Sequence, residues 1–463
     1  MKKYLCMAAA GMFLFSACSN DDDAINGGNG NASTDFTGQE LVMKVANGGD
    51  GLTTKAGRPL YSSEAAQAID KVKLAIFKLN DQKKIESCVY ATEFDNWNNT
   101  GSESYGGTTV DGSVDHGRFK SLNLKKVINE TASNKGLDEG TYKIYAVGYT
   151  SGGAYTYLPT LADIAKDWAD ATTFNYVSAT TANKGEEIFA GEIAEITVDT
   201  DRNFTVVEGK PDNNVLYLHR QVAGAFGYFK NIPVAGPDGT EATGLRLVAS
   251  ARNKQLNMTA FNSEFRETGD RHVAYVVNGS ESENTTNAKF KDNSNAFTVY
   301  EITLNDWFKQ MDENNDGVLN EKDSWSIPAS MTEFKARKGT VFGGEFVIPF
   351  KNQNKATFEL QLIKGSGADA KILRSWTVNL DKTQTNVEEI DGTEITGESI
   401  SFYSIVRNHL YSIGEKAIAN PTDPENPGPD PENPEDLSKG QILTLRVNDN
   451  WEVIHKLEVE PEI

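Results

Sequence analysis

Cysteine and long apolar runs are scarce in this chain, and each absence limits what it can be. There are 3 cysteines in 463 residues, of which Cys6 lies in an N-terminal apolar segment and Cys18 follows that segment. Only Cys88 remains in the body of the chain, so no disulfide can form there and stability has to come from buried apolar area. No apolar run after Cys18 is long enough for a membrane-spanning helix.

Signatures of catalysis and of nucleic-acid binding are also missing. The five histidines, His116, His219, His272, His409 and His455, have neither metal-ligand spacing nor a nucleophile nearby, and there is no phosphate-binding loop or zinc motif. Lys and Arg number 45 against 66 Asp and Glu, and the formal net charge is -21. This charge disfavours nucleic acid and anionic membrane as partners, and we expect no enzyme.

The N-terminus has the pattern of a lipoprotein signal peptide over residues 1–17. Lys2 and Lys3 precede an apolar run that ends at Phe15, and Ser16-Ala17 then lead into Cys18. Cleavage would leave Cys18 as the lipid-bearing N-terminal residue, with palmitate among the expected acyl chains. Asp21-Asp22-Asp23 resembles the surface-export tag of some Gram-negative lipoproteins, so we expect an outer-membrane lipoprotein precursor exported to the cell surface. The alternative is an ordinary secretory signal with an incidental cysteine.

Composition and periodicity predict an all-β fold. The chain has 40 Gly, 16 Tyr and 22 Phe, and short alternating segments separated by Gly, Ser and Asn loops. We expect residues 18–58 to hold a tether, a first strand and a cleavage loop, followed by β-sandwiches over 59–214 and 215–418. One helix is predicted around Leu161 to Asp170.

The end of the chain is a linker followed by a strand. Six of the 14 prolines lie between Pro421 and Pro434, which predicts an extended linker over 419–439. Residues 440–463 then alternate apolar and polar side chains, so one face is apolar. The apolar positions are Leu443, Leu445, Val447, Trp451, Val453, Leu457 and Val459. Such a strand either joins a sheet of another molecule as a donor strand or folds back as a hairpin, with Asn448-Asp449-Asn450 as its turn.

A short strand is also predicted near the start of the mature chain. Leu41, Met43 and Val45 alternate over residues 40–45, and the loop that follows contains Lys55 and Arg58. A trypsin-like protease could cleave after Lys55. The peptide bond between Arg58 and Pro59 is a poor substrate for such an enzyme. The strand before the loop could therefore be removed, although Lys55 could equally be an ordinary surface lysine.

Residues 312–323 have the spacing of a calcium-binding loop. Asp312, Asn314 and Asp316 stand at positions one, three and five, Gly317 at six, and Asp323 at twelve. Val318 would supply a carbonyl oxygen at position seven, and Leu304, Trp307, Phe308 and Met311 have the spacing of an entering helix. We expect a structural Ca²⁺ here. The alternative is an Asx-rich surface turn without a metal. In having Asp at position twelve, the loop resembles those of dockerins.

The order of these features resembles the fimbrillins, the subunits of type V pili. The resemblance rests on the lipobox, the short strand and basic loop, the 72–77 strand, His219-Arg220-Gln221-Val222-Ala223, Val406-Arg407-Asn408-His409-Leu410-Tyr411 and a terminal strand with Asp449-Asn450-Trp451. It implies two transthyretin-like β-sandwiches, removal of the first strand by a trypsin-like protease, and filling of the vacated place by another subunit's terminal strand.

The sequence thus predicts a fimbrial subunit that polymerises by donor-strand exchange and supports adhesion. Its expected partners are other fimbrial subunits, the maturation protease and a surface ligand on a host or bacterial cell. An alternative is a monomeric surface lipoprotein that binds glycans through Tyr155 and Tyr157. A dockerin-like scaffold component is disfavoured because there is one loop and no tandem copy.

Overall fold

The structure is a computed structural model that describes part of the chain. The described residues are 38–45, 69–97, 100–108, 114–131, 133, 135–149, 176–178, 184–185, 187–205, 213–257, 275–284, 297–329, 336–350, 358–380, 387–389, 394–395, 405, 407, 409–414, 433–440 and 442–450. Lys55, Arg58 and Cys18 lie outside them, as do the predicted helix at 161–170, Tyr155, Tyr157, Trp451, Val453, Leu457 and Val459. No helix in the described part is long and apolar enough to span a membrane.

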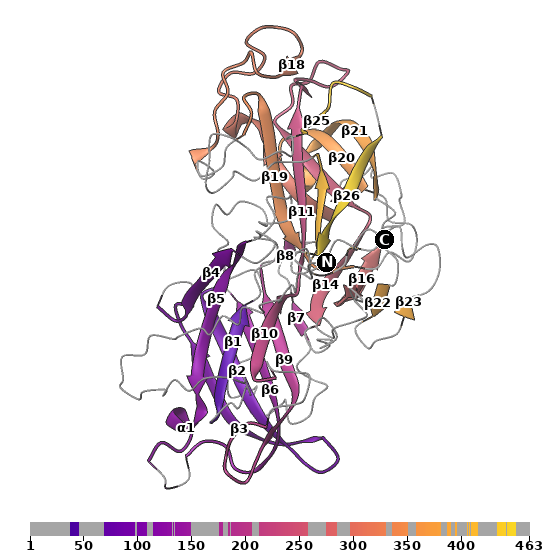
Figure 1. Cartoon of the computed structure of the whole chain (residues 1–463). Helices are drawn as coiled ribbons and strands as arrows, with labels where there is room; N and C mark the ends of the chain where they lie inside the picture. The colour runs from indigo at the N-terminus through magenta and orange to yellow at the C-terminus, as the bar shows by residue number, and fades with distance from the viewer. Residues whose placement is uncertain are drawn as a thin grey trace, which may run out of the picture. The chain divides into compact units, whose positions relative to one another are not determined.

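The first sheet has eight strands and contains the short strand predicted at residues 40–45 (Figure 1). In order across the sheet they are β3 (Ile85–Phe94), β2 (Lys71–Leu79), β6 (Gly140–Tyr149), β9 (Phe189–Val198), β10 (Val215–Arg220), β1 (Glu40–Val45), β5 (Val114–Asn123) and β4 (Glu103–Thr108). A short helix, α1 (Leu124–Val127), follows β5.

β10 joins the two halves of this sheet. Its residues 215–218 pair with β1, and His219 and Arg220 pair with β9. Alternate apolar residues of both halves meet in one buried cluster, so the halves pack face to face as a sandwich. Leu41, Met43 and Val45 of β1 and Val72 and Leu74 of β2 are all 0% exposed in it.

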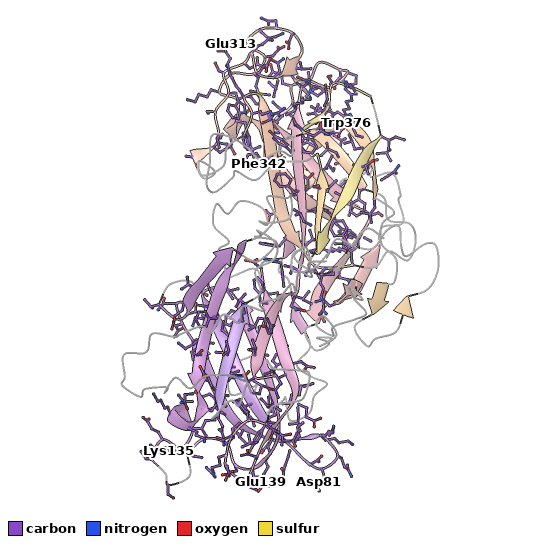
Figure 2. The ribbon with its side chains drawn as sticks, viewed as in Figure 1. Asp81, Lys135, Glu139, Glu313, Phe342 and Trp376 are labelled. Carbon is purple, nitrogen blue, oxygen red and sulfur yellow. The ribbon has the colours of Figure 1, made fainter. Side chains whose placement is uncertain are left out.

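The second sheet has ten strands and includes β26 (Leu443–Asn450), the last described strand of the chain. In order they are β17 (Phe297–Thr303), β13 (Gly244–Ala249), β20 (Phe358–Lys364), β21 (Lys371–Leu380), β26 (Leu443–Asn450), β24 (His409–Ile413), β11 (Ala223–Lys230), β19 (Thr340–Val347) and β8 (Lys184–Gly185), with β25 (Glu435–Asp436) paired to β11. Its core is rich in aromatic residues, among them Phe342 and Trp376, which are labelled in Figure 2.

Three smaller sheets complete the described strands. They are β12 (Ile232–Pro233) with β18 (Val318–Leu319), β16 (Gly279–Asn284) with β14 (Ala251–Asn257) and β7 (Tyr176–Ser178), and β15 (Tyr275–Val277) with β22 (Val387–Glu389) and β23 (Glu394–Ile395). The expected all-β sandwich fold is confirmed, because the regular elements of the described chain are almost all strands and the two large sheets surround apolar clusters.

Two of the predicted domain boundaries differ from those that the sheets show. The second block was expected to begin at residue 215, but β10 belongs to the first sheet, so the change of sheet follows Arg220. The end of the predicted linker is also structured. β25 pairs with β11, and Leu437 is 0% exposed, because this one apolar residue reaches the second core. Phe36–Ile463 groups as one compact unit that contains both sheets.

The predicted entering helix at 304–311 is not an α-helix. A 3-10 turn, η3 (Leu304–Asp306), is followed by a bridge between Phe308 and Trp325. Leu304, Trp307 and Phe308 are buried in the second core, so tertiary packing explains the apolar spacing that indicated a helix.

Candidate functional site

β1 lies in the middle of the first sheet, hydrogen-bonded on both sides. Val42, Met43, Lys44 and Val45 pair in parallel with β10, and the same four residues pair antiparallel with β5. Leu41, Met43 and Val45 face the core, while Glu40 is exposed. We call the place between β5 and β10, together with Leu137 and Arg202, the β1 site.

A buried glutamine fixes the start of β1 in this site. The Gln39 side-chain amide donates to the Leu137 carbonyl at 2.8 Å and to the Arg202 carbonyl at 3.1 Å. Its carbonyl oxygen accepts from the Leu137 N–H at 2.7 Å. Gln39 is 1% exposed, so these contacts replace those with water and define one register for the strand.

Two further contacts surround Gln39. Asn214, just before β10, donates from its side chain to the Glu40 carbonyl at 2.9 Å. Gly136 has a φ of +85°, and a side chain there would come within 2.5 Å of the Gln39 side-chain oxygen. The site is therefore shaped around the glutamine. Sequence reasoning did not single out Gln39, because one polar residue before a strand carries no recognisable motif.

β26, the predicted donor strand, is also central, but in the second sheet of the same chain. Leu443, Thr444 and Leu445 pair in parallel with β21, and Arg446, Val447, Asn448 and Asn450 pair antiparallel with β24. Leu443 and Leu445 are 1% exposed. The strand thus folds back into its own sheet, and it continues through Asn448-Asp449-Asn450, so these residues do not form the predicted hairpin turn.

The packing of β26 leaves space beneath it. A small apolar pocket lies in the second core, lined by Leu445 of β26 and Tyr411 of β24 together with residues of neighbouring strands. Among the described pairs, Leu443, Thr444 and Leu445 have partners in β21, and the later residues of β26 have partners in β24.

The segment before β26 is anchored on β11 by a carboxylate. Asp436 accepts from the Asn231 side-chain amide at 3.0 Å and from the Ser438 hydroxyl at 2.7 Å. Partial burial raises the pKa of Asp436, but the hydrogen bonds from Ser438 and Asn231 outweigh it and the net pKa is lowered. The carboxylate is therefore charged at neutral pH.

The predicted calcium loop is closed by its own hydrogen bonds; Glu313, labelled in Figure 2, belongs to it. The Asp312 carboxylate accepts from the backbone N–H groups of Asp316 and Gly317, and that of Asp323 accepts from Glu313 and Asn320. The side-chain hydrogen bond from Asn320 is the largest influence that lowers the pKa of Asp316.

In the described part of the chain, no group of three or more His, Cys, Asp or Glu side chains is placed to hold a metal. The remaining predicted ligands are the Asn314 side chain, which donates to Asp316 at 2.8 Å, and the Val318 carbonyl, which Asn320 approaches at 3.4 Å. The loop fold is compatible with the motif, and calcium binding stays a prediction.

The two internal segments on which the family resemblance rests are brought together. The Gln221 side-chain oxygen accepts from Arg407 at 3.3 Å and from Asn278 at 3.2 Å, and all three residues are buried. Next to them Arg220 forms an ion pair with Glu187 at 2.7 Å, with both side chains 1% exposed. A buried pair needs such hydrogen bonding to offset desolvation, so we interpret this cluster as structural.

Comparison with known proteins gave matches among solved structures only. No protein-family model matches the chain, and no curated protein matches it. A protein of Bacteroides eggerthii named for cell adhesion is 12% identical, with a TM-score of 0.30, over 89% of this chain and 98% of that one. A cell adhesion protein of Parabacteroides distasonis is 11% identical, with a TM-score of 0.31, over 88% and 96%.

The fimbrial anchor protein Mfa2 from Porphyromonas gingivalis is also similar, at 8% identity and a TM-score of 0.29, over 81% of this chain and 89% of that one. Superpositions of this quality do not assign the chain to a family, and the functional argument rests on β1 and β26.

Proposed function

We propose that this chain is a structural subunit of a cell-surface fimbria that polymerises by donor-strand exchange and supports adhesion. The observation that carries the proposal is the place of β1. It is a short strand in the centre of a sheet, with three fully buried apolar side chains, and it precedes a loop with a protease-sensitive sequence.

Cleavage after Lys55 is the proposed trigger. It would separate residues 18–55, which include β1, from the rest of the first sandwich. Loss of β1 would expose the core that Leu41, Met43 and Val45 cover, at about 1.5 to 3 kcal/mol for each side chain. Open backbone groups on β5 and β10 would add to this cost, so the cleaved subunit would bind any strand of suitable pattern.

The terminal strand is the proposed donor. β26 carries apolar side chains on one face, and it follows a Pro-rich segment that has the composition of an extended leash. In the uncut chain β1 fills its own site and β26 completes the second sheet. Strand exchange would therefore begin only after proteolysis. Because of this requirement, the precursor would stay monomeric during export.

Two further features belong to the proposal. Cys18 would carry the lipid that takes the precursor to the outer membrane. A Ca²⁺ ion bound by Asp312, Asn314, Asp316, Val318 and Asp323 would stabilise the loop beside β12. The spacing of these residues supports this role, and the ion would have no part in strand exchange.

Limited proteolysis tests the proposal. The recombinant chain from residue 19 would be treated with trypsin, and the products separated in detergent without heating. We expect a ladder of oligomers that collapses on boiling, and no ladder from a chain that lacks residues 440–463. Monomers that stay monomeric after cleavage within 46–58, shown by mass spectrometry, would contradict strand exchange.

The monomeric glycan-binding lipoprotein is the second candidate. One observation favours a monomer, namely that β26 already lies in its own sheet. A glycan array with the uncut chain, and with Tyr155 and Tyr157 changed to Ala, separates the two functions. Saturable glycan binding that depends on these tyrosines, without any ladder after proteolysis, would favour this alternative.

A further inference from the structure

The two central strands lie in related octapeptides. Residues 38–45 read Gly-Gln-Glu-Leu-Val-Met-Lys-Val, and residues 440–447 read Gly-Gln-Ile-Leu-Thr-Leu-Arg-Val. The Gly, Gln, Leu and final Val are identical, and Met43 with Leu445 and Lys44 with Arg446 are conservative exchanges. The dissimilar positions are 40 with 442 and 42 with 444, which have the opposite parity to the buried residues.

The shared positions are those that the β1 site contacts. Leu41, Met43 and Val45 are each 0% exposed, and Gln39 forms the three hydrogen bonds to Leu137 and Arg202. By contrast, Glu40 is exposed in β1, and Ile442, just before β26, is 65% exposed. The similarity is therefore confined to the features that a strand needs in the β1 site.

The similarity also includes the two residues Gly440 and Gln441, which precede Ile442 and β26. In the β1 site the corresponding residues contribute directly. The Gly38 carbonyl accepts from the Phe204 N–H at 2.9 Å, and the Gln39 carbonyl accepts from the Leu124 N–H at 2.9 Å. A Gly-Gln pair at the start of a donor segment therefore fits the β1 site.

We propose that residues 440–447 of one copy of this chain occupy the place of residues 38–45 in a second copy, in this register. Gln441 takes over the contacts of Gln39 with Leu137 and Arg202. Leu443, Leu445 and Val447 fill the places of Leu41, Met43 and Val45. Arg446 takes the place of Lys44, whose ammonium lies 5.9 Å from the centre of the Tyr217 ring.

This inference rests on the proposed strand exchange and adds its partner and its register. The partner is another copy of the same chain, because the acceptor contacts and the matching donor octapeptide are in one sequence. The physical gain is clear from the pairing. A strand in the β1 site is hydrogen-bonded on both sides over four consecutive residues.

A disulfide across the proposed joint tests the register. Val42 pairs with Ser121 of β5, so Thr444 of the donor should face Ser121 of the acceptor; in the uncut chain Thr444 pairs with Asn379. A chain from residue 19 with Cys88→Ser, Thr444→Cys and Ser121→Cys is treated with trypsin and then oxidised. The matched control has Asn123→Cys instead of Ser121→Cys, which places the thiol opposite position 40.

We expect a reducible, boiling-resistant ladder with Cys at 121, at least tenfold stronger than with Cys at 123. A stronger ladder with Cys at 123 would overturn the register while leaving strand exchange intact. A detergent-resistant ladder with no disulfide at either position would also overturn the register and leave strand exchange intact. Absence of any ladder, before or after oxidation, would overturn the proposed function and this inference together.

A second set of variants tests the glutamine. Gln441→Leu should slow ladder formation at least tenfold, whereas Ile442→Glu, which gives the donor the exposed residue of β1, should leave the rate unchanged. Gln39→Leu should not slow the ladder, since Gln39 leaves with the cleaved segment. Equal rates for Gln441→Leu and the parent would show that the glutamine does not set the register.

Discussion

β1 and β26 have similar neighbours but are held differently. Each is a central strand with one parallel and one antiparallel partner. β1 is paired on both sides along most of its length, and Gln39 closes one end with buried hydrogen bonds. Among the described pairs, β26 pairs with β21 at its start and with β24 further along, and it borders a small apolar pocket.

The proposed function requires one strand that leaves only after proteolysis and one strand that can exchange. A strand held on both sides by backbone hydrogen bonds is released slowly, because all of them must break together. Leu445 of β26 borders unfilled space, so loss of its side chain disturbs the packing less. The comparison predicts that equivalent changes in the two strands have unequal effects.

Truncation of a core side chain should give the largest difference. Met43→Ala is expected to lower the free energy of unfolding by about 3 to 5 kcal/mol, and Leu445→Ala by about 2 to 3 kcal/mol, because Leu445 already borders unfilled space. Urea denaturation of the uncut variants measures both. Equal losses would remove the proposed distinction between the two strands.

Loss of the Gln39 amide should have a smaller effect. Gln39→Leu leaves the Leu137 N–H and carbonyl without their buried partner, which costs about 1 to 3 kcal/mol. Hydrogen exchange should become faster in β1 and its β5 partner residues. Glu40→Ala is the control, since Glu40 is exposed and its substitution should change neither quantity.

Calcium should act on the sandwich that contains β26 and not on the one that contains β1. The loop contains β18, which pairs with β12, so calcium binding would stabilise the second sandwich. The gain is about 1.4 kcal/mol when the free Ca²⁺ concentration is tenfold above the dissociation constant. Calorimetric titration measures binding, with Asp312→Asn and Asp316→Asn together as control. No heat and no chelator-sensitive shift in melting temperature would contradict the site.

Acid should loosen the anchor of β26 and spare that of β1. The pKa of Asp436 is lower when folded than when unfolded, so its contribution is present above about pH 4 and is lost as the pH falls through the folded value. Gln39 carries no charge. As the pH is lowered from 5 to 3, the protection of backbone amides against hydrogen exchange should fall in β25 before it falls in β1. Asp436→Asn should remove that pH dependence.

Much of the architecture was predictable because strand period depends on local pattern. The alternation of Leu41, Met43 and Val45 predicted β1 with the bounds that the structure shows. The spacing of Leu304, Trp307 and Phe308 gave the wrong element, because aromatic residues in a sandwich core can occur at helical intervals in a turn.

The candidate site was predictable only in part. The apolar face of the terminal strand was visible, but its pairing depends on which sheet offers a free edge, and no periodicity contains that information. Gln39 was missed because its meaning comes from Leu137 and Arg202, far away in the chain. The Gly-Gln pair at 440–441 was the signal that could have identified it.

The sequence by itself determined that the chain is all-β, that a short apolar strand precedes a loop containing Lys55, and that a similar apolar segment follows the Pro-rich linker, since these depend on residues adjacent along the backbone. Only the tertiary structure decided that both strands are central, that a buried amide sets the register of β1, and that β26 completes the second sheet. These depend on contacts between residues 98 to 163 positions apart, as in the hydrogen bonds of Gln39, and distant contacts form only when the whole sandwich closes.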